Sequence, residues 1–134
     1  MMDAFERTQL DYQKLLDESI PLGQAAIMLS TPSHELRRRI QERALYGIVK
    51  EGVWHLPRFQ FVGDRLLPGL DHVLPAIGYG AHPLELQRWF TLPHQGLVVG
   101  DAETPVSPAE WLVTGQPVEN VVRLADEVLN PSTS

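Results

Sequence analysis

The sequence predicts an α+β fold that is mainly helical and contains small β-hairpins. Short apolar stretches recur at helical spacing, and frequent prolines and glycines, 11 and 10 of the 134 residues, interrupt them. Two β-rich stretches, 47–56 and 97–106, each surround a glycine-containing tip that is typical of a hairpin. The length suits one domain or two very small ones. The expected segments are 1–19, 20–62, 63–130 and 131–134.

The composition excludes several classes of protein. The chain has no cysteine, which rules out a disulfide framework and thiolate metal sites. No apolar run approaches the ~20 residues of a membrane-spanning helix, and the N-terminus carries an early acid without an apolar signal region. With 43% hydrophobic and 21% charged residues, the chain has the composition of a folded protein. We therefore expect a globular cytoplasmic protein.

The formal net charge of -6 is unevenly distributed along the chain. Residues 20–62 hold six Lys or Arg against three Asp or Glu, whereas 63–134 hold three against nine and 1–19 hold two against five. The acidic total argues against a general nucleic-acid coat protein. Because local charge sets the local field, the basic segment still predicts an anion-binding face between acidic flanks.

Two segments flank the folded units. The acidic segment 1–19 carries apolar residues that fit an additional helix. These residues are Phe5, Leu10, Tyr12, Leu15 and Leu16. The sequence leaves open whether such a helix packs on the folded units or masks the basic face. The last residues, 131–134, are expected to form a disordered tail.

The basic segment begins with two predicted helices. The first opens after Pro21, where an apolar stripe at i, i+3, i+4 and i+7 starts. The second is predicted over 32–45, with Thr31 as N-cap and Pro32 as first residue. Two short helices joined by a tight turn, the second rich in arginine, are typical of a helix-turn-helix. The inward-facing residues are Leu22, Ala25, Ala26 and Leu29 on the first helix and Leu36, Ile40 and Ala44 on the second.

A predicted hairpin follows the second helix. Its strands lie at 47–49 and 53–56, and its tip is Lys50-Glu51-Gly52. Pro57 ends the second strand, and one further helical turn is expected at 58–61. Helix, turn, helix and hairpin follow one another in the order of a winged helix-turn-helix, which we expect over 20–62.

These residues resemble a known family of small bacterial DNA-binding domains. Leu22-Gly23-Gln24-Ala25-Ala26, followed by a second helix and the stretch 45–57, is similar to the MerR and excisionase class. The resemblance implies that the second helix enters the major groove of DNA and that the hairpin, or wing, lies along the backbone. This sequence departs from the class at Pro32, where many members have an apolar residue, and the departure could shift the start of that helix.

Side-chain chemistry suggests which residues would contact DNA. Arginine binds guanine bidentately or grips a phosphate, which favours Arg37 and Arg38, and Lys50 at the wing tip suits a phosphate. Glu35 stands four residues before Arg39, so an intrahelical pair explains that arginine. A solvated helix face explains any single arginine here as well as DNA contact does. The full set of candidate DNA-binding residues is Ser33, His34, Arg37, Arg38, Gln41, Lys50 and Arg58.

The acidic C-terminal unit is predicted to be helical. An apolar stripe over 70–77 closes at Gly78 and Gly80, and His82-Pro83 opens the next helix. Ser107-Pro108-Ala109-Glu110 is a capping box that starts a short helix, and the last helix is expected over 117–129.

This unit carries a second resemblance. The stretches 89–94, 107–112 and 114–115, with a closing helix 118–128, are similar to the toxin-binding domain of the Xre/MbcA/ParS antitoxins. They are equally similar to a mycobacterial winged-helix regulator family, in which 67–70 also has a counterpart. Either resemblance implies a dimer or partner surface, although aromatic residues at helical spacing more often belong to a core than to a docking surface. The candidate interface residues are Trp89, Phe90, Trp111, Val121, Val122 and Val128.

The leading hypothesis is a homodimeric, sequence-specific double-stranded DNA-binding regulator located at the nucleoid. The alternative is an antitoxin of a type II pair that neutralises a partner toxin, and a third is an excisionase-like factor that bends DNA. We expect no enzyme, no cofactor and no metal, because catalytic and phosphate-binding motifs are missing and the five histidines lack ligand spacing.

Overall fold

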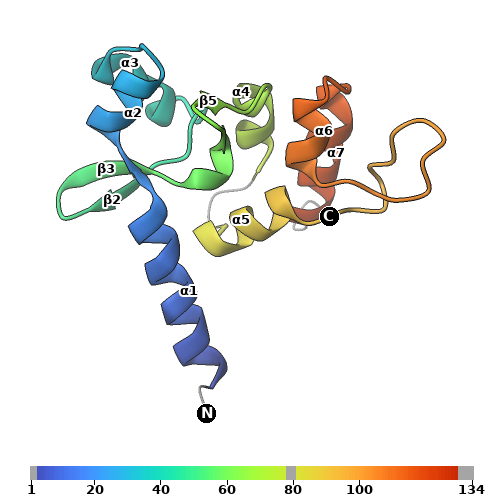
Figure 1. The fold of residues 1–134 in the computed structure, drawn as a ribbon, viewed down its shortest axis with the longest axis horizontal. Helices are drawn as coiled ribbons and strands as arrows, with labels where there is room; N and C mark the ends of the chain where they lie inside the picture. The colour runs from blue at the N-terminus through green and yellow to red at the C-terminus, as the bar shows by residue number, and fades with distance from the viewer. Residues whose placement is uncertain (1–2, 78–80, 130–134) are drawn as a thin grey trace.

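The structure is a computed structural model that describes residues 3–77 and 81–129, and it has an α+β fold (Figure 1). Gly78, Gly80 and the tail 131–134, for which the sequence made predictions, lie outside the described residues. The helices are α1 Ala4–Glu18, α2 Leu22–Met28, α3 Ser33–Gln41, α4 Leu70–Val73, α5 Pro83–Thr91, α6 Pro108–Val113 and α7 Val118–Leu129, with 3-10 turns η1 Arg58–Gln60 and η2 Leu74–Ala76. The strands are β1 Ile20–Pro21, β2 Ile48–Lys50, β3 Val53–Leu56, β4 Phe61–Val62 and β5 Arg65–Leu66.

A three-stranded antiparallel sheet organises the N-terminal part. Its strand order is β1-β3-β2, so β1 pairs with β3, the second strand of the β2–β3 hairpin, and Ile20 lies opposite Leu56. The sequence analysis missed β1, because a two-residue strand is too short to show alternation. Pro21 is compatible with this position, since a proline without an N–H is tolerated on an edge strand.

The predicted hairpin at 47–56 is confirmed. Its two-residue turn has Glu51 at φ 52° and Gly52 at φ 78°, and positive φ at both positions is typical of the turn that matches strand twist. Strand β2 starts at Ile48 and not at Gly47. The helical turn expected after Pro57 forms as η1.

The second helix of the basic segment is shorter than predicted. Helix α3 starts at Ser33 without a side-chain cap, and the Thr31 hydroxyl donates to the Leu29 carbonyl at 3.0 Å instead of capping the helix. At the other end Arg43 adopts φ 63°, and the Ala44 N–H reaches back to the Arg39 carbonyl at 2.8 Å. This Schellman closure ends the helix at Gln41. The predicted extent of 32–45, with Thr31 as N-cap and Ala44 on the helix, is therefore wrong.

One hydrophobic core joins the predicted units. Phe59 of η1 stacks on Phe90 of α5 with ring centroids 5.3 Å apart, and Trp89 meets Phe90 edge-on at 4.9 Å. The same cluster of buried residues extends from Ile20 in β1 to Ala125 in α7. The described residues of the segments 20–62 and 63–130 thus fold against each other around shared aromatic residues.

The side chain of buried Gln60 is hydrogen-bonded to the segment that connects α3 to strand β2. Its side-chain oxygen accepts from the Tyr46 N–H at 2.7 Å, and its side-chain nitrogen donates to the Tyr46 carbonyl at 2.9 Å. The backbone carbonyl of Gln60 accepts from the Leu67 N–H at 2.8 Å. A buried amide is stable only when its polar atoms are paired, so Gln60 determines how the α3–β2 connection sits.

The C-terminal helices begin close to where the sequence predicts. His82 caps α5 by accepting from the Leu84 N–H at 3.1 Å, and Ser107 caps α6 by accepting from the Glu110 N–H at 3.1 Å. The stripe 70–77 forms α4 followed by η2, because a proline follows Leu74 and interrupts the helix.

The second predicted hairpin, 97–106, does not form. This stretch is a loop in which the Val106 N–H donates to the Leu97 carbonyl at 2.9 Å. Leu97 is buried and anchors the loop on the core, so tertiary packing, and not strand pairing, holds this segment. In the described part of the chain no helix is long and apolar enough to cross a membrane.

The acidic segment forms the extra helix α1, which projects from the body (Figure 1). Its C-terminal half packs on α5, where Leu15 is buried and Tyr12 lies against His82 with ring centroids 5.0 Å apart. Asp11 pairs with Arg88 of α5 at 3.8 Å. The sequence left open whether this segment packs on the folded units or masks the basic face, and the structure shows that α1 packs on α5.

Candidate nucleic-acid interface

Helix α3 presents a polar face to solvent. Its buried side is marked by Leu36, whereas His34, Arg37, Arg38 and Gln41, which recur at i, i+3, i+4 and i+7, are all exposed. Ser33 is half-buried at the start of the helix. The structure therefore brings four of the seven predicted DNA-binding residues together on one accessible surface, which we call the α3 face.

Arg38 is held by carboxylates of its own helix. Its guanidinium donates to Glu35, with one bond of 3.2 Å from Nε, and to both carboxylate oxygens of Glu42 at 2.9 and 3.0 Å. The hydrogen bond from Arg38 lowers the pKa of the Glu35 carboxyl, so the pair is fully ionised at neutral pH. Because all of these groups are at the surface, water screens the pairs and makes them easy to exchange.

Arg37 is the unpaired cation of the α3 face within the described residues. Its side chain is exposed, and it makes no hydrogen bond or ion pair with residues 3–77 or 81–129. The neighbouring Arg39 lies 3.5 Å from Glu35, which confirms the intrahelical pair expected from their spacing. An unpaired guanidinium beside a helix surface can reach a base edge or a phosphate without first breaking a bond.

Lys50 and Arg58 line a groove beside α1 to which no residue of α3 contributes. Lys50 Nζ is 3.3 Å from Asp17 Oδ1, and Arg58 Nε donates to the Glu18 carbonyl at 3.1 Å. Both contacts are made with the C-terminal turn of α1, and all four residues line the same open groove of about 720 Å³. Sequence reasoning missed these contacts, because they join residues 33 and 40 positions apart.

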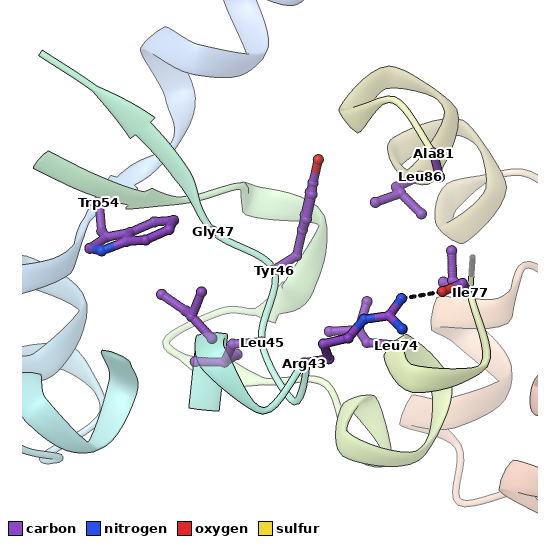
Figure 2. Close-up of a pocket in the computed structure, with 10 residues that line it drawn as sticks. Arg43, Leu45, Tyr46, Gly47, Trp54, Leu74, Ile77, Ala81 and Leu86 are labelled. Carbon is purple, nitrogen blue, oxygen red and sulfur yellow. Dashed lines mark hydrogen bonds between the residues drawn. The ribbon is translucent and has the colours of Figure 1, made fainter. Parts of the chain in front are cut away.

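A second hollow, of about 300 Å³, lies between the hairpin root and the C-terminal helices (Figure 2). On one side it is lined by Trp54 and Gly47, and on the other by Leu74 and Leu86. The Arg43 guanidinium crosses toward the Ile77 carbonyl and donates a hydrogen bond to it. This contact ties the end of α3 to the C-terminal part.

Most of the predicted partner interface is buried. Trp89, Phe90, Trp111 and Val121 lie in the core of the single chain, so they form no docking surface in this fold, and their prediction as interface residues is corrected. Val122 is half-buried, and Val128 keeps 47% of its surface exposed. The toxin-binding alternative therefore receives no support from the residues that suggested it.

The histidines and acids of the described ranges hold no metal-binding cluster of three or more such side chains. His82 serves instead as the cap of α5, and a ring nitrogen of His94 lies 3.3 Å from the Trp89 carbonyl. The structure thus gives these two histidines local roles in the backbone architecture.

The fold and the site define a small α+β protein whose arginine-bearing helix is exposed beside a β-hairpin. Neither the known family models nor the curated proteins contain a match to this chain. Among solved structures it is similar to the NMR structure of Rv2175c, with a TM-score of 0.59 and 22% sequence identity. The similarity covers 83% of this chain and 80% of that chain, and it concerns the fold alone.

Proposed function

We propose that this protein binds double-stranded DNA in a sequence-specific way through a winged helix-turn-helix and acts as a transcriptional regulator. The element order β1-α2-α3-β2-β3, with β1 beside β3, supports this assignment. In such a domain the second helix reads the major groove, and the hairpin contacts the backbone.

The observation that carries the proposal is the α3 face. A nine-residue helix is about 13.5 Å long and fits the major groove in width and length. Arg37 is placed to bind guanine or a phosphate, and Gln41 can pair with adenine. His34 lies one turn before Arg37 and two turns before Gln41, and it completes a row of polar side chains along the helix.

The charge distribution supports the same orientation. Helix α3 and the hairpin lie on one side of the molecule, and α6 and α7 lie on the other (Figure 1). Because the part from 63 onward carries nine acids and three bases, it would be repelled by the DNA backbone and points away from it.

A homodimer completes the proposal. One small winged helix makes few contacts, and two-fold symmetric half-sites are the usual way to reach specific affinity. Since four of the six predicted interface side chains are buried, the exposed side of α7 around Val128 is the more suitable surface. A homodimer predicts an operator with two inverted half-sites.

The test is selection of duplexes from a random library, followed by competition with shuffled sequences of the same composition. The proposal predicts enrichment of a defined motif that shuffled duplexes fail to displace. Equal competition by shuffled DNA would leave only non-specific binding and would contradict it. An enriched site that is strongly bent on circular permutation would favour the excisionase-like alternative.

A further inference from the structure

Two of the candidate DNA-binding cations, Lys50 and Arg58, are both held by the C-terminal turn of α1. Asp17 Oδ1 lies 3.3 Å from Lys50 Nζ, and the Glu18 carbonyl accepts from Arg58 Nε at 3.1 Å. Lys50 ends strand β2 and Arg58 begins η1, so these contacts come from separate elements of the basic segment. They converge on the same groove beside α1.

The end of α1 is suited to neutralise these cations. The C-terminus of a helix carries partial negative charge on its unpaired carbonyls, and the Glu18 carbonyl is one of them. Hydrogen bonds from Gln13 and Lys50 hold the pKa of the Asp17 carboxyl below its ordinary value, so the group stays charged at neutral pH. A carboxylate and a carbonyl thus stand where phosphate oxygens would be bound.

The contact is weak enough to be exchanged. Asp17 is exposed, with 59% of its side-chain surface accessible, and water screens an exposed ion pair so that it adds little stability. Helix α1 is anchored elsewhere, through Leu15 and Tyr12 on α5. Loss of the Lys50 contact would therefore leave the helix in place.

We propose that the C-terminal turn of α1 is an intramolecular competitor of the DNA backbone. Asp17 and the Glu18 carbonyl hold Lys50 and Arg58 in free protein, and phosphates replace them when DNA binds. The competitor lowers affinity for every duplex by a similar factor, so that only duplexes which also engage the α3 face remain tightly bound. This inference rests on the proposed function and describes regulation of the same site.

The test compares Asp17→Asn with Glu6→Gln, which removes the same charge from the exposed first turn of α1. The Kd for the selected duplex and for a shuffled duplex is measured by fluorescence anisotropy. Asp17→Asn is expected to tighten binding of both duplexes by about two- to five-fold, whereas Glu6→Gln changes it little. An equal gain from Glu6→Gln would show a general charge effect and overturn the proposal.

A double-mutant cycle gives the second criterion. Lys50→Gln is expected to weaken binding and to abolish the gain from Asp17→Asn, because the released cation is no longer present. Persistence of the full gain in the Lys50→Gln background would contradict the competitor. Circular dichroism and thermal melting of each variant show that the fold is retained.

The outcomes separate this inference from the proposed function. If wild type binds the selected duplex and Asp17→Asn binds it equally well, the competitor is wrong and DNA binding stands. If neither wild type nor any variant binds a duplex, both proposals fail together.

Discussion

Arg37 and Arg38 are neighbours on α3, but only Arg38 is held by carboxylates, those of Glu35 and Glu42. The two arginines therefore differ in what DNA binding would require of them. Arg37 can bind directly, whereas Arg38 must exchange its carboxylate partners for phosphate or base acceptors.

This difference predicts unequal effects of truncation. Arg37→Ala is expected to weaken binding of the selected duplex by about 5- to 150-fold, which corresponds to the 1–3 kcal/mol of a good base contact. Arg38→Ala is expected to cost less, because the wild-type side chain gives up ion pairs on binding. Anisotropy titrations measure both, with Arg7→Ala in the exposed N-terminal part of α1 as the control that leaves Kd unchanged. A larger loss for Arg38→Ala would contradict this ranking.

Gln60→Ala should lower the free energy of unfolding more than the loss of an exposed polar side chain does. The substitution leaves the Tyr46 N–H and carbonyl without their partner in a buried position, at a cost of about 1–3 kcal/mol for each unsatisfied group. Urea denaturation measures the free energy of unfolding. Gln87→Ala, on the exposed side of α5, is the matched control and should change it by less than about 0.5 kcal/mol. Equal stability of the two variants would refute the role of Gln60.

Gly47→Ala should disturb the hairpin root. A Cβ there would lie 2.9 Å from Ile40 Cδ1 and 2.9 Å from Trp54 Cε3, and such overpacking costs about 1–3 kcal/mol. Gly23→Ala is the control, because a Cβ at Gly23 meets nothing within 4 Å and alanine favours the helix. Thermal melting should show a loss for Gly47→Ala and a small gain for Gly23→Ala. A gain for both would mean that the close approach at Gly47 carries no cost.

Acid should weaken the ion pairs of α3. The Arg38 hydrogen bond lowers the pKa of Glu35 in the folded protein below the 4.5 it ordinarily has. The stabilisation is therefore complete above that ordinary value and is lost as pH falls through the lowered folded pKa. Urea unfolding at pH 7 and at about pH 3 should show a smaller loss for Glu35→Gln than for wild type. An equal loss of free energy of unfolding in both proteins would mean that the Glu35–Arg38 pair contributes no stability.

Local patterns in the sequence predicted much of the fold. The glycine-containing hairpin tip, the Pro83 and Pro108 helix starts and the last helix are short-range signals, and each was confirmed in outline. The tip is shorter than the predicted Lys50-Glu51-Gly52, because Lys50 belongs to strand β2. The early end of α3 was missed because a non-glycine residue, Arg43, takes the left-handed position that usually signals a helix end by glycine.

The parts of the site that depend on long-range contacts could not be predicted. The ion pairs of α3 are local and do not belong to this group: the spacing predicted the pair of Glu35 with Arg39, and the pairs that hold Arg38 were missed although they stand at i,i+3 and i,i+4. The Asp17–Lys50 contact joins α1 to the hairpin, and no local pattern encodes it. For Trp89 the periodicity was compatible with a core or a partner surface, and only the packing around it decided between them.

The central claim, that the α3 face of a winged helix-turn-helix binds DNA, is tested most directly by the salt dependence of duplex binding. A plot of log K against log salt concentration should fall linearly for wild type, by about 0.9 per phosphate neutralised. Arg37→Ala should weaken binding throughout, with a slope reduced by about one if this arginine contacts a phosphate. Binding that is indifferent to salt, or unchanged in Arg37→Ala with Arg38→Ala, would contradict the claim.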